Sequence, residues 1–229
     1  MTFADQYADH AYADLIREAE TQGRESLIAP GRFVARSSDR DLWLEARKQG
    51  VTATAVAKAA SGPAGFRDQL EARRNPVDVE VNAFMAWGSF MEPSIALWVK
   101  EQTGIMPNEW LIAHDDPRFL ATPDGLSLDH TLIAEIKTMG TDREKPPLDH
   151  VRQMQWQMFC MGEQCTRAFY AWQLRVDVPG GFAPGWIEPR SVWVERDEKM
   201  IADLVKVAER LIEEINWDFW ESQEGNNNG

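Results

Sequence analysis

The sequence predicts an α/β fold with a central mixed β-sheet flanked by helices. Apolar residues recur every three or four positions over residues 82–103, which is the period of a helix with one buried face. Short apolar or alternating runs follow at 110–113, 118–122 and 132–137, and each has the length of a strand. A second helix and two further strands come later, and this order of elements places helices against a sheet.

The 229-residue chain has the length of one large domain with short additions. We expect an N-terminal helix and basic loop over residues 1–38, a single domain over 39–220 and a disordered tail over 221–229. No window reaches the roughly 18 consecutive apolar residues of a membrane helix, and the acidic, mixed N-terminus lacks the pattern of a signal peptide. These features predict a soluble cytosolic protein without membrane contact.

Charge is distributed unevenly along the chain. The formal net charge of −13 argues at first against a nucleic-acid partner, because phosphate binding relies on Lys and Arg. Residues 23–74, however, hold ten Lys and Arg against six Asp and Glu. The acidic excess therefore lies elsewhere, and the early part of the chain keeps the positive charge that a nucleic acid needs.

The first elements are short. Weak helical spacing over residues 5–21 predicts an amphipathic helix that packs as an arm. Residues 23–38 combine proline, glycine and serine with arginines, which is typical of a basic loop. Asp39 or Asp41 can cap the next helix, which ends at Gly50.

A further helix starts after Gly50, with threonines where N-caps occur. Free N–H groups at a helix N-terminus bind phosphate, and Arg47 on the preceding turn would add charge beside Thr54. The simpler interpretation makes Thr54 a cap and Arg47 a surface cation. Local sequence alone favours that simpler interpretation, because helix caps are common.

The helix at 82–103 carries an acid in an unusual position. Its core face is formed by Trp87, Met91, Ile95 and Trp98. Glu92 lies on the neighbouring stripe among small and apolar residues, which is uncommon for a solvated face. It is either a half-buried structural carboxylate or an acid directed at a site around Asp124, and the helix pattern leaves both interpretations open.

The run 132–137 places two opposite charges on one face of a strand. Side chains alternate across a strand, so Glu135 and Lys137 leave it together. Unpaired buried charges are costly, and a divalent metal shared with Asp124 of the preceding Pro-Asp-Gly turn would compensate them. Asp124, Glu135 and the carbonyl of Ile136 supply the oxygen ligands that Mg²⁺ prefers.

The later elements complete the predicted sheet. Residues 139–148 form a loop that can cover the site, and a helix follows over 149–161. His150, Gln153 and Gln157 share one face of that helix. Glutamines can bind phosphate or water, although such a row is more often a wet helix face.

The sequence then predicts a strand at 167–176, another within 186–194 and a last helix over 197–219.

The chemistry that the candidate site residues support best is hydrolysis of a phosphodiester. A metal-bound water is a better nucleophile, and Lys137 is placed to hold it. No Ser-His-Asp set, Cys-His pair, Walker sequence or G-x-G-x-x-G has comparable support.

Asp124 with Glu135-Ile136-Lys137 resembles the signature of PD-(D/E)XK nucleases. The flanking segments are similar to one branch, the lambda exonuclease and YqaJ-type phage recombination exonucleases. One short signature is weak evidence, but six pieces occur in one order. The pieces are WLEARKQGVTAT (43–54), AWGSFMEP (86–93), ATPDGL (121–126), AEIKT (134–138), QMQWQM (153–158) and VERDEK (194–199).

The resemblance implies a PD-(D/E)XK restriction-endonuclease-like core and an exonuclease of the alkaline type. It implies 5′-to-3′ hydrolysis of linear double-stranded DNA that leaves 3′ single strands for annealing-type recombination. Mg²⁺ is the implied cofactor, with Mn²⁺ as a substitute and two ions when substrate is bound. A ring-shaped homotrimer, a single-strand annealing protein as partner and phage or prophage origin in a bacterial cytosol are also implied.

The resemblance also assigns roles to residues. Asp124 and Glu135 become metal ligands with the Ile136 carbonyl, and Lys137 positions the water. Glu92 is the upstream acid near the metals, and Gln153 is the motif glutamine. The expected contacts to DNA and its 5′ phosphate are Arg47, Thr54 and Gln157. Thr54 replaces the serine of the lambda enzyme and keeps the hydroxyl, while the first 38 residues match no family segment.

Two other functions remain open. A restriction-type endonuclease would use the same catalytic residues, and a catalytically idle DNA-end-binding or scaffold module would keep the fold alone. Intact Asp124, Glu135 and Lys137 speak against the idle module. Covalently closed circular duplex separates an exonuclease from an endonuclease, since a closed circle has no end.

Overall fold

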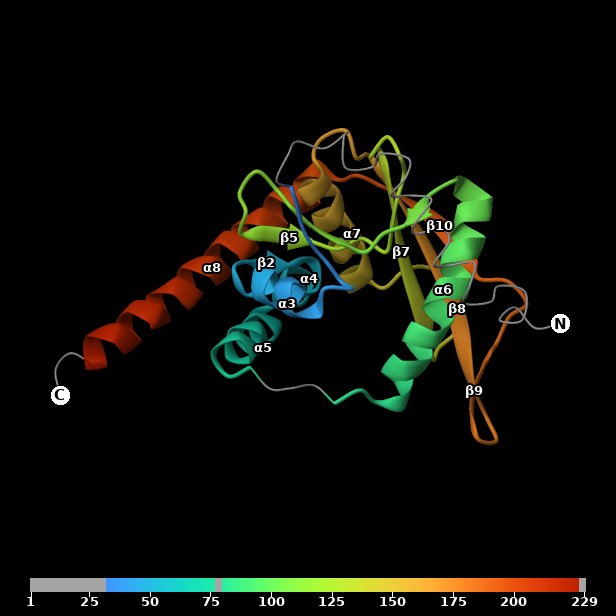
Figure 1. The fold of residues 1–229 in the computed structure, drawn as a ribbon, viewed down its shortest axis with the longest axis horizontal. Coiled ribbons are helices and arrows are strands. Elements are labelled where there is room, and N and C mark those ends of the chain that lie inside the picture. The colour runs from blue at the N-terminus through green and yellow to red at the C-terminus, as the bar shows by residue number, and fades with distance from the viewer. Residues whose placement is uncertain (1–31, 77–79, 227–229) are drawn as a thin grey trace.

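The computed structural model describes residues 32–76 and 80–226 (Figure 1). The predicted helix over 5–21 therefore lies outside the described residues. The helices are α3 (Arg40–Lys48), α4 (Ala53–Ala59), α5 (Pro63–Arg74), α6 (Ala83–Thr103), α7 (Leu148–Met161) and α8 (Glu198–Asn226). The strands are β1 (Phe33–Arg36), β2 (Val51–Thr52), β3 (Met106–Pro107), β4 (Trp110–Ala113), β5 (Phe119–Ala121), β6 (Gly125–Leu126), β7 (Leu132–Met139), β8 (Arg167–Val178), β9 (Gly181–Pro184) and β10 (Arg190–Glu195).

The strands form two mixed sheets, so the predicted α/β class with a mixed sheet is confirmed. The larger sheet has the order β10-β8-β7-β6-β3, with β9 paired to β8. Its central pair, β7 and β8, is parallel because α7 connects them, and β10 runs antiparallel to β8. The smaller sheet has the order β1-β4-β5-β2. The predicted hairpin is present as β4 and β5, with Ile112 opposite Ala121.

Helix α6 covers one face of the larger sheet (Figure 1). Asn82 caps it by accepting a hydrogen bond from the Met85 N–H at 3.0 Å, and Gly104 ends it in the left-handed region at φ 75°. The predicted core face is confirmed, since Met91 and Ile95 are completely buried against Ala134 and its neighbours.

Helix α7 packs on the opposite side of β7. Its methionines meet Ile133, Tyr170 and Trp172 from the sheet. A second apolar cluster joins α4, α5 and α8 to Trp156 of α7 and to Phe119 of β5. Helix α7 therefore lies between the large sheet and the smaller helices, and each of its faces is committed to a neighbour.

Several boundaries differ from the prediction. Residues 33–36 lie within the predicted basic loop but form β1, because pairing with β4 satisfies their backbone groups. Helix α8 runs to Asn226, beyond the predicted end at 219 and through 221–226 of the predicted tail, whereas 227–229 lie outside the described residues. Strands β2, β3 and β6 each have two residues, too few for any periodic pattern.

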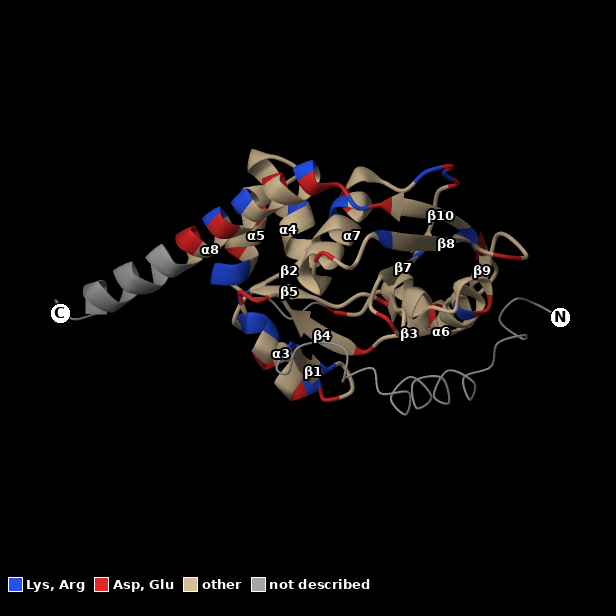
Figure 2. Cartoon of the chain, turned by 90° about the horizontal axis from the view of Figure 1, so that it is seen from above, with Lys and Arg blue, Asp and Glu red and all other residues tan. Residues whose placement is uncertain are grey.

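Charged residues of both signs alternate on α3, α5 and α8 in Figure 2. No helix among residues 32–76 and 80–226 has the length and apolarity to cross a bilayer. Both cysteines, Cys160 and Cys165, are buried free thiols.

Candidate active site

Strand β7 brings Glu135 and Lys137 together on one face, as the alternation predicted. The Glu135 side chain is completely buried, whereas 28% of the Lys137 side chain is exposed. Lys137 Nζ donates a hydrogen bond to Glu135 Oε1. Because β7 is paired on both sides, to β6 and to β8, its backbone holds the two charges in a fixed position.

The Pro-Asp-Gly turn holds Asp124 against the middle of β7. The backbone N–H of Ile136 donates to Asp124 Oδ2 at 2.7 Å. The neighbouring Gly125 packs tightly, since a Cβ there would lie 2.9 Å from Ile105 Cγ2 and 3.0 Å from Ala134 Cβ. Asn108 also supports the turn through its side-chain amide, which donates to the carbonyl of Pro123 at 2.9 Å. The sequence prediction missed Asn108, which no pattern distinguishes from an ordinary loop residue.

Glu92 of α6 belongs to the same group of charges. Burial raises the pKa of Glu92, and the nearby Glu135 and Glu109 raise it further, while Lys137 opposes them. Burial also raises the pKa of Asp124 well above its usual range, with added repulsion from Glu135 and Glu92. The two interpretations of Glu92 thus converge, since it is a half-buried acid that also faces the site.

These carboxylates suit a divalent cation. Glu135, Asp124 and Glu92 repel one another, and Lys137 alone compensates them only in part. Mg²⁺ commonly takes one or two carboxylates, with water and substrate oxygens completing its shell. Asp124 and Glu135 would hold it, while the backbone bond from Ile136 to Asp124 fixes the first of them. Within the described ranges, no cluster of three or more His, Cys, Asp or Glu has the arrangement of a metal site.

Two glutamines of α7 bind the Glu135 carboxylate. Gln153 Nε2 donates to Glu135 Oε1 at 2.6 Å, and Gln157 Nε2 donates to Glu135 Oε2 at 2.6 Å. Gln157 was predicted to contact DNA, and in this structure its side chain is completely buried. Gln153 is partly exposed, and it lines a cavity of about 170 Å³.

That cavity adjoins Lys137. It is lined by Thr54, Ala57, Lys58, Lys137, Asp149, His150 and Gln153. His150 Nδ1 lies 2.7 Å from the Tyr170 hydroxyl, so the imidazole is oriented by a strand of the sheet. His150 was expected on the glutamine face of α7, and the cavity places it beside Lys137.

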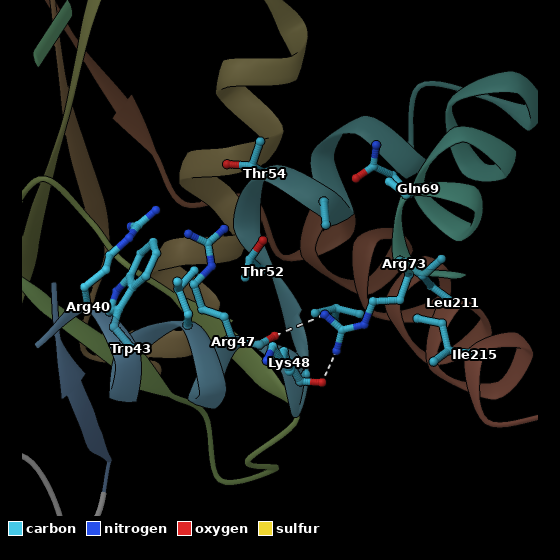
Figure 3. Close-up of a pocket in the computed structure, with 15 residues that line it drawn as sticks. Arg40, Trp43, Arg47, Lys48, Thr52, Thr54, Gln69, Arg73, Leu211 and Ile215 are labelled. Atoms are coloured by element: carbon cyan, nitrogen blue, oxygen red, sulfur yellow. Dashed lines mark hydrogen bonds between the residues drawn. The ribbon is translucent and has the colours of Figure 1, made fainter. Parts of the chain in front are cut away.

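A larger pocket of about 430 Å³ lies between α3, α4, α5 and α8 (Figure 3). Arg40 and Arg47 lie to either side of Trp43, with guanidinium carbons 5.0 and 4.1 Å from the centre of its ring. Arg73, which the prediction left out of the site, donates to the carbonyls of Arg47 and Lys48. Burial lowers the pKa of Arg47, as do the neighbouring Arg40 and Arg73. An anion in this pocket would relieve that repulsion.

Thr54 lines both the arginine pocket and the cavity beside Lys137. The interpretation of Thr54 as a helix cap is wrong, since Thr52 occupies the N-cap position and Thr54 lies inside the first turn of α4. The exposed Thr54 hydroxyl is therefore free of that role. The arginine pocket and the cavity beside Lys137, which the sequence did not connect, therefore share this residue.

The profile of the YqaJ-like viral recombinase domain matches residues 42–164. The chain belongs to this family. The matched segment contains every predicted site residue from Arg47 to Gln157, the whole lining of the cavity beside Lys137 and most of the lining of the arginine pocket. The predicted resemblance to YqaJ-type phage exonucleases is thereby confirmed. No curated protein sequence matches the chain.

Solved structures resemble the YqaJ-like domain over most of its length. An alkaline exonuclease from Laribacter hongkongensis has a TM-score of 0.68 at 24% identity, covering 82% of this chain and 100% of the other. Its complex with dAMP gives 0.65 at 23%, with the same coverage. A phage-related exonuclease from Haemophilus somnus 129PT gives 0.57 at 14%, covering 74% and 96%. These likenesses confirm the predicted PD-(D/E)XK core as the fold.

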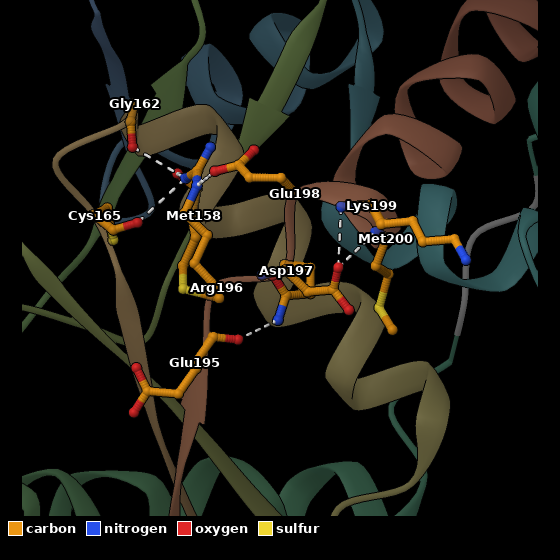
Figure 4. A network of polar contacts seen from close by, with 10 residues as sticks. Met158, Gly162, Cys165, Glu195, Arg196, Asp197, Glu198, Lys199 and Met200 are labelled. Atoms are coloured by element: carbon orange, nitrogen blue, oxygen red, sulfur yellow. Dashed lines mark hydrogen bonds and ion pairs between the residues drawn. The ribbon is translucent and has the colours of Figure 1, made fainter.

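A buried arginine fixes α7 of the YqaJ-like domain from its C-terminal end (Figure 4). Arg196 donates to the carbonyls of Met158, Gly162 and Cys165 at 2.7, 3.1 and 3.2 Å, and it pairs with Glu198. These carbonyls include the last turn of α7, which a helix leaves without partners. The VERDEK segment thus holds the helix that carries both glutamines of the site.

Proposed function

We propose that this YqaJ-like domain is a Mg²⁺-dependent 5′-to-3′ exonuclease acting on linear double-stranded DNA. It hydrolyses phosphodiesters and leaves 3′ single strands for annealing-type recombination. The observation that carries the proposal is the shared wall at Thr54, where an arginine-lined pocket meets the cavity that contains Lys137. A terminal phosphate seated in the first hollow would bring the neighbouring phosphodiester towards the second.

The acidic cluster supplies the chemistry. Asp124 and Glu135 would hold Mg²⁺, with the Ile136 carbonyl as a third oxygen, and Glu92 would serve a second ion when substrate is bound. Mn²⁺ is expected to substitute. A bound Mg²⁺ neutralises charge on the scissile phosphate and makes its water more acidic. Although burial opposes its charge, Glu135 and Asp124 raise the pKa of Lys137, so this residue acts as an ammonium that orients water or phosphate oxygen.

The arginine pocket would determine the direction in which the DNA strand is degraded. We assign Arg47 to the end phosphate in preference to Arg73, because Arg73 donates to two backbone carbonyls. Guanidinium binds phosphate through parallel hydrogen bonds, and the Thr54 hydroxyl adds one more. Selection of a 5′ end over a 3′ end follows from which terminus carries the phosphate.

The family resemblance extends the proposal to the assembly. We expect a homotrimeric ring around DNA, a single-strand annealing protein as partner, and action in the cytosol of a bacterium that carries the phage or prophage. Light scattering of the purified chain measures the first of these directly. A monomer on linear duplex would remove the ring from the proposal and leave the hydrolysis intact.

The decisive experiment compares two DNA forms. Purified protein with Mg²⁺ should shorten linear 5′-phosphorylated duplex from its ends and spare covalently closed circles, as followed on gels with either strand labelled. Lys137→Ala should reduce the rate by at least about 100-fold, because the water loses its orienting group, while circular dichroism stays unchanged.

Each other outcome assigns a different function. Cleavage of the closed circle at fixed positions would identify a restriction-type endonuclease. If the protein binds DNA ends but cleaves no duplex in the presence of Mg²⁺, it would be identified as the idle scaffold. Loss of the 3′-ended strand in place of the 5′-ended strand would reverse the proposed direction.

A further inference from the structure

We propose that Gln157 is a positioning residue for Glu135, and that the Oε1 oxygen of Glu135 is the one offered to the metal. This inference rests on the proposed function. Gln157 would keep Oε2 bound inside the protein, so that Glu135 holds a cation through one oxygen. No pattern in the sequence distinguishes this role from a contact with substrate.

The two glutamines bind Glu135 at equal distance but from different environments. They lie four residues apart on α7, which places them on one helix face. Gln153 is partly exposed in the cavity beside Lys137, whereas Gln157 has no exposed surface. The partners of Oε1 are therefore Gln153 and Lys137, which both line the cavity. The partner of Oε2 is Gln157, which lies in the protein interior.

This asymmetry decides which oxygen can change partners. Lys137 and Gln153 can turn towards a substrate or water in the cavity when a cation takes their place on Oε1. Gln157 has no such alternative, because Met154 and Met158 flank it in the core and its amide faces only Glu135 and, at 3.5 Å, the Thr122 carbonyl. The bond to Oε2 is therefore the one that persists.

The other half of the Gln157 amide points to the same conclusion. Its Oε1 atom is buried and has no hydrogen-bond partner among the described residues. An unpartnered buried carbonyl disfavours the folded state. The Gln157 side chain therefore lowers the stability of the folded state at its unpartnered oxygen. Its Nε2 atom, in contrast, has a partner in Glu135.

The test replaces Gln157 by an apolar residue of similar length. Gln157→Met in the full chain removes the donor to Oε2 and fills the same space. We expect a 10–100-fold weaker affinity for Mn²⁺, measured by calorimetry without DNA, because ligand-orienting hydrogen bonds have effects of this size. The Mg²⁺ concentration for half-maximal hydrolysis should rise equally, and the preference for 5′-phosphorylated ends should stay unchanged.

The matched control is Gln155→Met on the same helix. Gln155 is also buried, but it donates to the Glu195 carbonyl and accepts from the Asp197 N–H, both at 2.8 Å. We expect a lower melting temperature and an unchanged Mn²⁺ affinity. A purely structural role for Gln157 predicts this same result for Gln157→Met.

Three outcomes separate the possibilities. A folded Gln157→Met with wild-type Mn²⁺ affinity overturns the inference and leaves the proposed function standing. If Gln157→Met fails to fold, Gln157→Asn keeps the amide but is too short to reach Oε2, so wild-type affinity in that variant overturns the inference equally. Absence of metal binding and hydrolysis in the wild-type protein overturns the proposed function itself.

Discussion

The folded protein strongly disfavours the charged form of the Asp124 carboxyl group. Burial comes first among the causes that raise its pKa, and Glu135 and Glu92 add to it. The backbone N–H of Ile136 keeps one carboxyl oxygen in place despite that repulsion. Asp124 is thus held in place, while Lys137 compensates its charge only in part.

This strain has a measurable sign. A folded-state pKa above the unfolded value means that the protonated form is favoured by folding, and that this stability is lost as pH rises through the folded pKa. Asp124→Asn keeps the acceptor for Ile136 and removes the charge. At about pH 8 we expect the metal-free variant to melt about 2–4 °C higher, the scale of ~1 kcal/mol for this length, and hydrolysis to fall at least about 100-fold.

Scanning calorimetry in a chelator checks the expectation for Asp124→Asn. Asp203→Asn is the control, because Asp203 lies exposed on α8 and pairs only with Lys206. A lower melting temperature for Asp124→Asn alone would contradict the account of its burial.

The same groups set the pH dependence of hydrolysis. Asp124 and Glu92 have raised pKa values and must lose their protons for a cation to bind, while the raised pKa of Lys137 keeps the ammonium charged in alkali. At saturating Mg²⁺ we expect the rate to rise with pH at values above the ordinary carboxyl pKa, and to show no decline until pH passes the ordinary lysine pKa. A decline that begins below the ordinary lysine pKa would contradict the role of Lys137 as an ammonium.

Among the secondary-structure elements, helix α7 is the one that connects the hydrophobic core with the candidate active site. One side of it enters the core with Met154 and Met158, and another carries Gln153 and Gln157 to Glu135. Its C-terminal carbonyls are held by Arg196 from the junction of β10 and α8. The position of the glutamines therefore depends on a residue near the far end of the domain.

Arg196→Ala should destabilise the fold strongly. The side chain is 10% exposed, and its loss removes this donor from the carbonyls of Met158, Gly162 and Cys165, so we expect the free energy of unfolding in urea to fall by about 2–4 kcal/mol. Arg167→Ala is the control, since Arg167 forms an exposed pair with Glu195 and should cost less than about 1 kcal/mol. Equal losses would show that α7 does not depend on this anchor.

For the molecule as a whole, an arginine-rich hollow is present despite a net charge of −13. The hollow draws its lining from α3, α4, α5 and α8, and Leu211 and Ile215 of α8 contribute apolar surface to it. Under the proposed function, the acidic remainder would repel DNA from other surfaces, while the cations would attract a phosphate to this one.

Arg47→Ala should remove the preference for phosphorylated ends. A charge-assisted hydrogen bond contributes about 1.5–3 kcal/mol, so we expect kcat/KM on 5′-phosphorylated duplex to fall about 10–100-fold and to approach the value for 5′-hydroxyl duplex. Arg67→Ala, on an exposed part of α5 outside this pocket, is the control and should behave as wild type. An undiminished preference in Arg47→Ala would place the end phosphate elsewhere.

Helices and strands that are long enough to show a periodic pattern of apolar residues could be predicted from the sequence. Helix α6, the β4–β5 hairpin and strand β7 follow from apolar spacing, and the pairing of Glu135 with Lys137 follows from alternation along one strand. These are local properties, since each depends on residues close together in the chain. The family resemblance followed from the order of six such local segments.

Contacts between residues that are distant in the chain could not be predicted from local patterns. Asn108, Arg73 and the cavity at Thr54 depend on contacts between separate elements, and no local pattern records such contacts. Gln157 was expected to face DNA, because helical spacing gives a side chain a direction but not a neighbour. Packing of α7 against β7 turned that residue inward to Glu135, since burial is a property of the assembled fold.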